Sequence, residues 1–367
     1  MQRRRCFQGG VTFLALSLGA SSGSAQTFIE RELRIPMAAA GPKGLQALLI
    51  VPNQPGRHPL ALISHGSPPS AEAARKVHPY LMWPQAMEFA RRGWGAAIVM
   101  RRGFGQSGGE KGEMLGACDH ADYQTGADAV VADLQASIQY LGSLPEVDTS
   151  KMIALGTSAG GFASVALTAA APPGLKAAIS FAGGRGSEQN GQVCSPETLV
   201  KTFSNFGLKS RVPMLWVYAE NDQYFPPALA RRFYQAFTGA GGQARFVQTG
   251  PSGENGHFLF AQGIPVWTPI VDDYLRRERL VLRSELLPLP VTNLPPPRQL
   301  GAKGHEAFNA YLHAGPHKAF AVSSKGAFAW VGGRSSAKEA EEDAVANCQK
   351  RPGEACSAYV VDNQTRH

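Results

Sequence analysis

The chain has 367 residues, of which 44% are hydrophobic and 17% are charged. This composition is typical of a globular protein with a sizeable core, and it excludes an intrinsically disordered chain. The formal net charge is +8, but no basic run interleaved with aromatic residues accompanies it, so nucleic acid is not an expected partner.

The first 25 residues have the pattern of an export signal. Arg3, Arg4 and Arg5 precede an apolar stretch at 11–20 that is too short to span a bilayer, and small residues follow it. We therefore predict a signal peptide over 1–25 and a mature periplasmic or secreted chain with a net charge of +5. The alternative is an uncleaved anchor or a disordered tail. No later segment is apolar and long enough for stable membrane insertion.

Apolar segments of strand type alternate with amphipathic segments of helix type from residue 28 to about 280. This alternation predicts an α/β domain over 26–285, with a mostly parallel sheet flanked by helices. The first two strands have no helix between them and are expected to pair as an antiparallel edge hairpin. Strands are predicted at 28–35, 46–51, 60–64, 95–100, 152–156, 177–181, 214–218 and 244–248, and helices at 84–92, 123–144, 161–171, 227–240 and 266–277.

Two early polar segments have two interpretations each. Arg101 and Arg102 could bind a substrate carboxylate, but the interpretation we favour is that they order their own glycine-rich turn. The polar cluster at 118–123 could line a pocket, and the favoured interpretation is that it caps the long helix that follows.

The segment at 156–160 reads Gly-Thr-Ser-Ala-Gly and matches G-x-S-x-G around Ser158. A predicted strand runs into it and a predicted helix follows. A serine on such a sharp turn has a strained backbone and stands exposed at the C-terminal edge of a sheet, and only small neighbours fit around it. We therefore interpret Ser158 as a nucleophile. The alternative is a glycine-rich loop with an idle serine.

A serine nucleophile needs a base that takes its proton and an acid that orients the base, and both are expected later in the chain. Asp222 follows the strand at 214–218 and is the predicted acid, with Glu220 as its competitor and a helix cap as its alternative role. His257 follows the strand at 244–248 and is the predicted base. Its alternative is a histidine on a surface loop.

Acyl transfer also needs donors for the oxyanion. We predict the backbone N–H of Ala159, which follows the nucleophile, and that of Ser67, in the loop after the strand at 60–64. The alternative is that His65 and Gly66 before it form only a tight turn. His65 is expected to be a structural hydrogen-bonding group.

The composition changes at 286–302, where five prolines predict an extended linker. Residues 303–367 then predict a small α+β domain with a hairpin at 318–323 and 327–331, a helix that begins with a capping box at Ser336 and Glu339, and a last strand at 357–361. The segment at 183–210 is expected to form a small cap near the site.

Four cysteines remain after the predicted signal, which allows three disulfide connectivities in an oxidising compartment. Their grouping favours a bridge between Cys118 and Cys194 and another between Cys348 and Cys356, which would stabilise the small domain. Buried free thiols are the alternative. A metal site is not expected, because no C-x-x-C motif or histidine cluster is present.

Together, the Ser158, Asp222 and His257 set, the His65-Gly66 pair and the glycine-rich run at 101–109 resemble an α/β-hydrolase over residues 28–280. The resemblance is strongest to the dienelactone hydrolase-like and serine-aminopeptidase-like branches. It implies the α/β-hydrolase fold and no cofactor. Dienelactone hydrolases carry a nucleophilic Cys where this chain has Ser158, so the lactone substrate is not carried over. The tail resembles a small two-Cys domain of unknown function found on exported bacterial proteins.

These features lead us to expect an exported serine hydrolase that cleaves an ester of a small molecule. A peptidase that acts on short peptides is the alternative within the same chemistry. An alternative of another class is a cell-envelope binding protein on a hydrolase scaffold, with contact through the tail and the positive charge.

Overall fold

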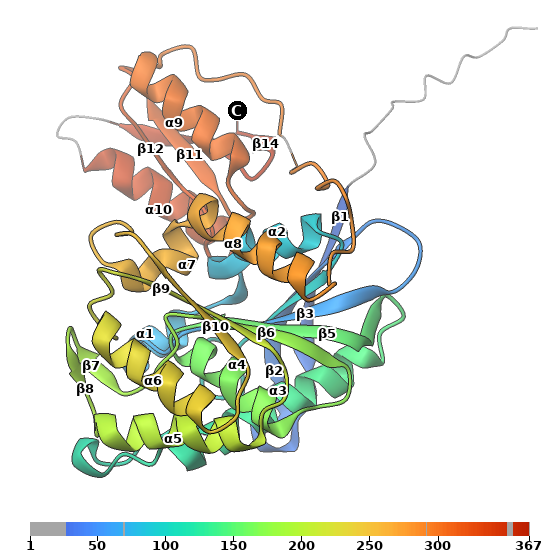
Figure 1. The fold of residues 1–367 in the computed structure, drawn as a ribbon. Helices are drawn as coiled ribbons and strands as arrows, with labels where there is room; N and C mark the ends of the chain where they lie inside the picture. The colour runs from blue at the N-terminus through green and yellow to red at the C-terminus, as the bar shows by residue number, and fades with distance from the viewer. Residues whose placement is uncertain (1–26, 69, 291, 351–354, 367) are drawn as a thin grey trace, which may run out of the picture.

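An eight-stranded sheet forms the centre of the molecule (Figure 1), in a computed structural model that describes residues 27–68, 70–290, 292–350 and 355–366. The predicted signal peptide lies outside these residues. The strand order is β1-β2-β4-β3-β5-β6-β9-β10, and β2 alone runs against its neighbours. The strands are β1 (Phe28–Ile35), β2 (Leu45–Pro52), β3 (His58–Ser64), β4 (Gly95–Val99), β5 (Val147–Thr157), β6 (Leu175–Phe181), β9 (Met214–Ala219) and β10 (Ala244–Thr249).

The predicted parallel sheet and antiparallel edge hairpin are confirmed. Strands β2, β4 and β9 are buried along their whole length, as expected for continuous apolar runs covered on both faces. Ser64 of β3 pairs with Gly156 of β5, so the loops that follow these two strands leave the same edge of the sheet. This register brings the segment after Ser64 beside the turn that holds Ser158.

Helices cover both faces of this sheet (Figure 1). One face packs against α3 (Tyr123–Gly142), α4 (Ala159–Ala170), α5 (Pro196–Lys209) and α6 (Pro227–Gly239). The other packs against α2 (Trp83–Arg91) and α8 (Ile264–Arg277). Shorter helices are α1 (Ala71–Lys76) and α7 (Leu259–Gln262), and single 3-10 turns occur at Ala38–Lys43, Pro79–Met82, Cys118–His120 and Gly256–Phe258.

The segment at 183–210 differs from the small cap that the sequence suggests. Only its first part is peripheral, with a short hairpin of β7 (Ser187–Gln189) and β8 (Gln192–Val193). The rest is α5, whose Leu199, Phe203 and Phe206 are buried in the core. The Phe203 ring stacks on that of Phe233 with centroids 4.6 Å apart, so α5 belongs to the helical layer of the main domain.

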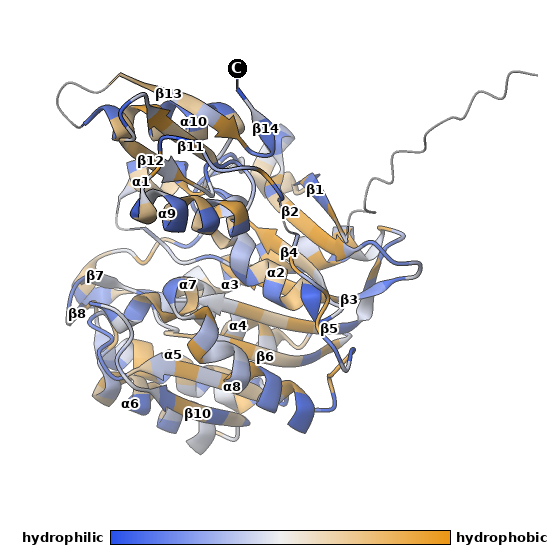
Figure 2. Ribbon diagram, turned by 90° about the horizontal axis from the view of Figure 1, so that it is seen from above, coloured by the Kyte–Doolittle hydropathy of each residue, from blue (hydrophilic) through white to orange (hydrophobic). Residues whose placement is uncertain are grey.

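The C-terminal part forms a separate small domain with a four-stranded antiparallel sheet in the order β12-β11-β13-β14. The domain lies beside α2 and α8 in Figure 1, and Figure 2 shows hydrophobic residues concentrated in the strands of both sheets. Helix α9 precedes it, which the sequence analysis did not predict. The elements are α9 (Ala302–His313), β11 (Ala319–Ser323), β12 (Phe328–Val331), α10 (Ala337–Gln349), β13 (Cys356–Val361) and β14 (Gln364–Thr365).

Two disulfides link the four cysteines in the pairs that the sequence favours. Cys118 bonds Cys194 across 76 positions and ties the β7–β8 segment to the start of α3. Cys348 bonds Cys356 and joins α10 to β13. In the part of the chain that the structure describes, no helix has the length and hydropathy of a membrane span.

Candidate active site

Ser158 occupies the turn between β5 and α4 with a positive φ of 56°, in the region that side chains rarely adopt. The two flanking glycines are required by close packing. A Cβ on Gly160 would lie 2.0 Å from the carbonyl oxygen of Ser64, and one on Gly156 would lie 2.5 Å from the Gly160 backbone. The turn is therefore built as a strained elbow that displays the serine.

Asp222 and His257 meet from separate loops. The Nδ1 atom of His257 lies 3.1 Å from Oδ1 and 3.2 Å from Oδ2 of Asp222. Both residues are buried, at 3% exposure for Asp222 and 7% for His257. The N–H groups of Tyr224 and Phe225 each donate to Asp222 Oδ1 at 2.9 Å, which fixes the carboxylate. Glu220, the competing acid, is exposed.

The contacts of His257 assign its tautomer. A carboxylate at Nδ1 accepts a hydrogen bond, so Nδ1 carries the proton and Nε2 has a lone pair available. The Asn255 side chain accepts from the backbone N–H of His257 at 3.0 Å. The centroids of the Tyr224 ring and the imidazole are 4.5 Å apart. Within the described residues, Ser158 Oγ has no hydrogen bond to His257.

The loop after β3 lies against Ser158. A Cβ on Gly66 would lie 3.3 Å from Ser158 Cβ and 3.9 Å from its Oγ. The N–H of Ser67 has no acceptor in the described residues, and that of Ala159, at the first position of α4, has none within the helix. Both predicted oxyanion donors are thus free to donate, from the two loops that the β3–β5 register brings together.

Arg101 and Arg102 are both paired inside the protein. Arg101 Nε donates to Glu113 Oε2 at 2.8 Å, and Arg102 Nε donates to Asp133 Oδ1 at 2.5 Å. These contacts argue against a carboxylate clamp, because both guanidinium groups are already paired with carboxylates of the protein. In the second polar cluster, the Asp122 carboxylate accepts from Thr125 N–H at 2.9 Å and caps α3, which agrees with the favoured interpretation.

His65 is structural, as expected. The N–H of Arg101 donates to its Nε2 at 3.1 Å, so Nδ1 carries the proton and donates to the Gly66 carbonyl at 2.6 Å. Burial and the nearby Arg101 charge lower the pKa of His65 to about 3, which keeps the ring neutral.

Two residues next to this site were missed by the sequence analysis. Glu113 is buried and accepts hydrogen bonds from Ser67, Arg101 and Arg185. Arg185 is buried in the segment after β6 and lies 72 positions from Glu113. No local pattern marks such a pair, because only the fold brings its members together.

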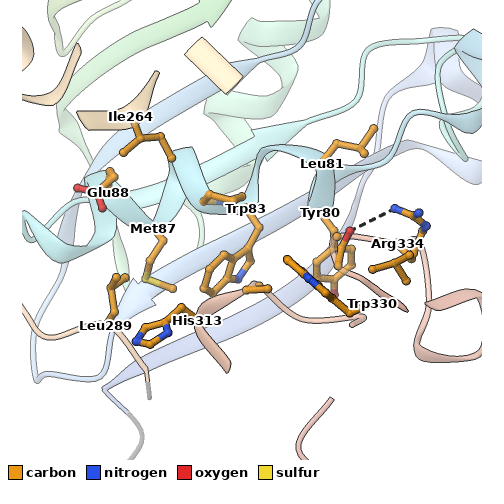
Figure 3. A pocket seen from close by; sticks show the side chains of 16 residues that line it. Tyr80, Leu81, Trp83, Met87, Glu88, Ile264, Leu289, His313, Trp330 and Arg334 are labelled. Atoms are coloured by element: carbon orange, nitrogen blue, oxygen red, sulfur yellow. Dashed lines mark hydrogen bonds between the residues drawn. The ribbon is translucent and has the colours of Figure 1, made fainter. Parts of the chain in front are cut away.

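A separate cavity of about 640 Å³ lies between α2 and the C-terminal domain, and the three predicted catalytic residues do not line it. The aromatic side chains of Tyr80, Trp83 and Trp330 line it (Figure 3). Its polar lining residues are Glu88, His313 and Arg334, so aromatic and apolar side chains dominate. Within the described residues, no three His, Cys, Asp or Glu side chains form a group suited to a metal ion.

Comparisons with known proteins concern the family and the fold. Residues 89–248 match the sequence profile of the dienelactone hydrolase family. Among curated proteins, none matches the sequence. An acylaminoacyl peptidase of Pyrococcus horikoshii is similar in structure, with 16% identity, a TM-score of 0.51, and coverage of 72% of this chain and 44% of the peptidase.

Two esterases are also similar in structure. Est1E from Butyrivibrio proteoclasticus has 17% identity and a TM-score of 0.48, and the match covers 68% of this chain and 98% of Est1E. Acetyl xylan esterase 1 from Thermoanaerobacterium sp. has 15% identity and a TM-score of 0.45, with coverage of 68% and 87%. At such identities these likenesses concern the fold alone.

Proposed function

We propose that this chain, which carries a dienelactone hydrolase family domain on an α/β-hydrolase fold, is an exported serine hydrolase that cleaves an ester bond. The observation that carries the proposal is the buried contact of 3.1 Å between His257 and Asp222, together with the strained elbow at Ser158. Serine hydrolases need a buried acid that orients a histidine and a serine on a sharp turn, and this chain supplies these three groups.

In the proposed mechanism, Ser158 Oγ attacks the ester carbonyl carbon while His257 Nε2 takes its proton. Asp222 holds Nδ1–H and stabilises the imidazolium that forms. The N–H groups of Ala159 and Ser67 stabilise the negative charge on the carbonyl oxygen. His257 then gives its proton to the departing alcohol. A water molecule, deprotonated by the same histidine, hydrolyses the acyl-enzyme and restores Ser158.

Labelling with a fluorophosphonate probe tests this proposal. The folded wild-type protein should react at Ser158, and Ser158→Ala should not react. A wild-type protein with a normal circular dichroism spectrum and no labelling would rule the proposal out.

A peptidase that acts on short peptides is the second candidate, because an acyl-enzyme forms from an amide by the same steps with an amine as the leaving group. A panel of p-nitrophenyl esters against aminoacyl p-nitroanilides separates the two. Higher kcat/KM on the anilides would favour the peptidase.

The interdomain cavity is the observation that favours a binding role for the C-terminal domain. It is concave, largely apolar and of the size of small-molecule sites. If the protein is a cell-envelope binding protein, cell-wall material should retain the full chain, and Trp330→Ala should weaken retention. Equal retention of both proteins would oppose this candidate.

Export is part of the proposal. The two disulfides support it, since such bonds persist in oxidising compartments. Mass spectrometry of the periplasmic protein should find a mature chain that starts near Gln26.

A further inference from the structure

The side chain of Ser67 contacts a buried carboxylate. Its Oγ donates to Oε1 of Glu113 at 2.5 Å, and the Glu113 side chain is 2% exposed. Arg101 and Arg185 pair with the same carboxylate: Arg101 Nε donates to Oε2 at 2.8 Å, and Arg185 Nη1 donates to Oε2 at 3.3 Å. Arg185 Nη2 also donates to the Glu113 carbonyl at 2.5 Å. The loop that holds the second oxyanion donor is therefore joined to a buried ionic cluster.

Arg101 holds the start of the same loop. Its Nη1 donates to Ser64 Oγ at 2.8 Å and to the carbonyl oxygen of His65 at 2.7 Å, and its backbone N–H donates to His65 Nε2 at 3.1 Å. Ser64, His65 and Ser67 are thus each bonded to the Arg101–Glu113 pair. Gly66 has no side chain, and its backbone lies against Ser158.

The negative charge of Glu113 makes the Ser67 hydroxyl the donor of their hydrogen bond. Burial alone would raise the pKa of Glu113, but the guanidinium groups of Arg101 and Arg185 hold it well below its usual range, so the carboxylate stays ionised. An ionised carboxylate only accepts hydrogen bonds, so the Ser67 hydroxyl must donate, and a charge-assisted bond of this kind is strong. Rotation of the loop would break it.

We propose that Glu113 is a positioning residue for the oxyanion hole: through Ser67 Oγ it fixes the loop so that the Ser67 N–H points to the place where the oxyanion forms. The inference rests on the proposed function, and it assigns Glu113 no contact with substrate. Its effect should fall on kcat, because the oxyanion exists only after substrate has bound and begun to react.

The test measures kcat and KM of full-length variants on one p-nitrophenyl ester. Ser67→Ala keeps the backbone N–H but removes the bond to Glu113. It should lower kcat about tenfold, less than the ~10²-fold expected when a donor is lost outright, and leave KM within about twofold. Ser67→Thr keeps a hydroxyl and should recover most of the lost kcat.

A double-mutant cycle assigns the effect to the pair. Glu113→Gln should lower kcat in the wild-type background and have little further effect in the Ser67→Ala background, since the bond is already absent. Asp272→Asn is the control, because Asp272 is another carboxylate that accepts two hydrogen bonds from an arginine, Arg92, at 2.6 Å and 2.9 Å. It should leave kcat unchanged.

The results separate this inference from the proposed function. Additive losses in the cycle, an unchanged kcat in Ser67→Ala, or an equal loss in Asp272→Asn would each overturn the positioning role while the hydrolase proposal stands. If Glu113→Gln does not fold, the comparison of Ser67→Ala with Ser67→Thr still decides. A wild-type protein without fluorophosphonate labelling or turnover would overturn both.

Discussion

Nδ1 of His257 lies 3.1 Å from Oδ1 of Asp222, although the two residues are 35 positions apart. The sheet explains this contact. Strands β9 and β10 are parallel neighbours, and Ala219 pairs with Thr249 at their C-terminal ends. The loops that follow therefore leave the sheet side by side, and each contributes one member of the pair.

Replacing the acid should disable the base while leaving the fold intact. Asp222→Asn keeps an oxygen that can accept from the Tyr224 and Phe225 N–H groups, but it no longer stabilises an imidazolium at His257. We expect kcat to fall by about 10³- to 10⁴-fold. Glu220→Gln is the control, since this neighbouring acid is exposed. A loss of less than about tenfold in Asp222→Asn would argue that another group orients the histidine.

The elbow should tolerate no side chain at Gly160. Gly160→Ala places a Cβ 2.0 Å from the Ser64 carbonyl oxygen, so the strand or helix must move. We expect a loss of more than about 3 kcal/mol in the free energy of unfolding, measured with urea. Gly239→Ala, near the end of α6 and with no atom within 4 Å of the new Cβ, should be neutral or stabilise by up to about 1 kcal/mol. Equal effects at both positions would contradict the packing described.

The buried His65 should make stability depend on pH. Its pKa falls from 6.5 to about 3 on folding, so between these values the unfolded chain binds more protons than the folded one. Stability from this group is complete above pH 6.5 and is lost as the pH falls below it, by up to about 1.4 kcal/mol per pH unit.

Urea unfolding at pH 7 and pH 5 measures this loss. His65→Asn should reduce the difference between the two pH values, whereas His120→Asn, which alters an exposed histidine, should not. An unchanged pH dependence in His65→Asn would show that this ring does not stay neutral in the folded protein.

The two disulfides should differ in their effect on stability. The Cys118–Cys194 bridge closes a loop of 76 positions, and the Cys348–Cys356 bridge closes one of 8. Loop-closure entropy then predicts losses of about 4.5 and about 2.5 kcal/mol when each pair is replaced by serine. Denaturation of the two double variants checks the order, and a larger loss from the shorter loop would contradict it.

Much of the main sheet could be predicted because its strands are continuous apolar runs between clear breaks. The strand expected at 214–218, for example, is Met214–Ala219. The elbow at Ser158 could also be predicted, because such a sharp turn requires small flanking residues such as glycine. Its candidate partners, Asp222 and His257, could be predicted because each follows a predicted strand. Each of these features depends on residues that are close together in the sequence.

Helix α5 and the ionic cluster were not predictable in the same way. The glycine- and serine-rich start of the 183–210 segment favours a cap, whereas Leu199, Phe203 and Phe206 have the spacing of a core helix. Glu113 and Arg185 approach only after the sheet and helices assemble, so no spacing along the chain announces their contact.

In the proposed mechanism, Ser158 becomes acylated during turnover. The direct measurement is acid quenching during hydrolysis of p-nitrophenyl acetate, followed by mass spectrometry of the peptides. We expect one acetyl group on the peptide that contains Ser158, and neither acetylation nor turnover in Ser158→Ala. Steady hydrolysis by the wild-type protein with the acetyl group on another residue, or full activity in Ser158→Ala, would contradict it.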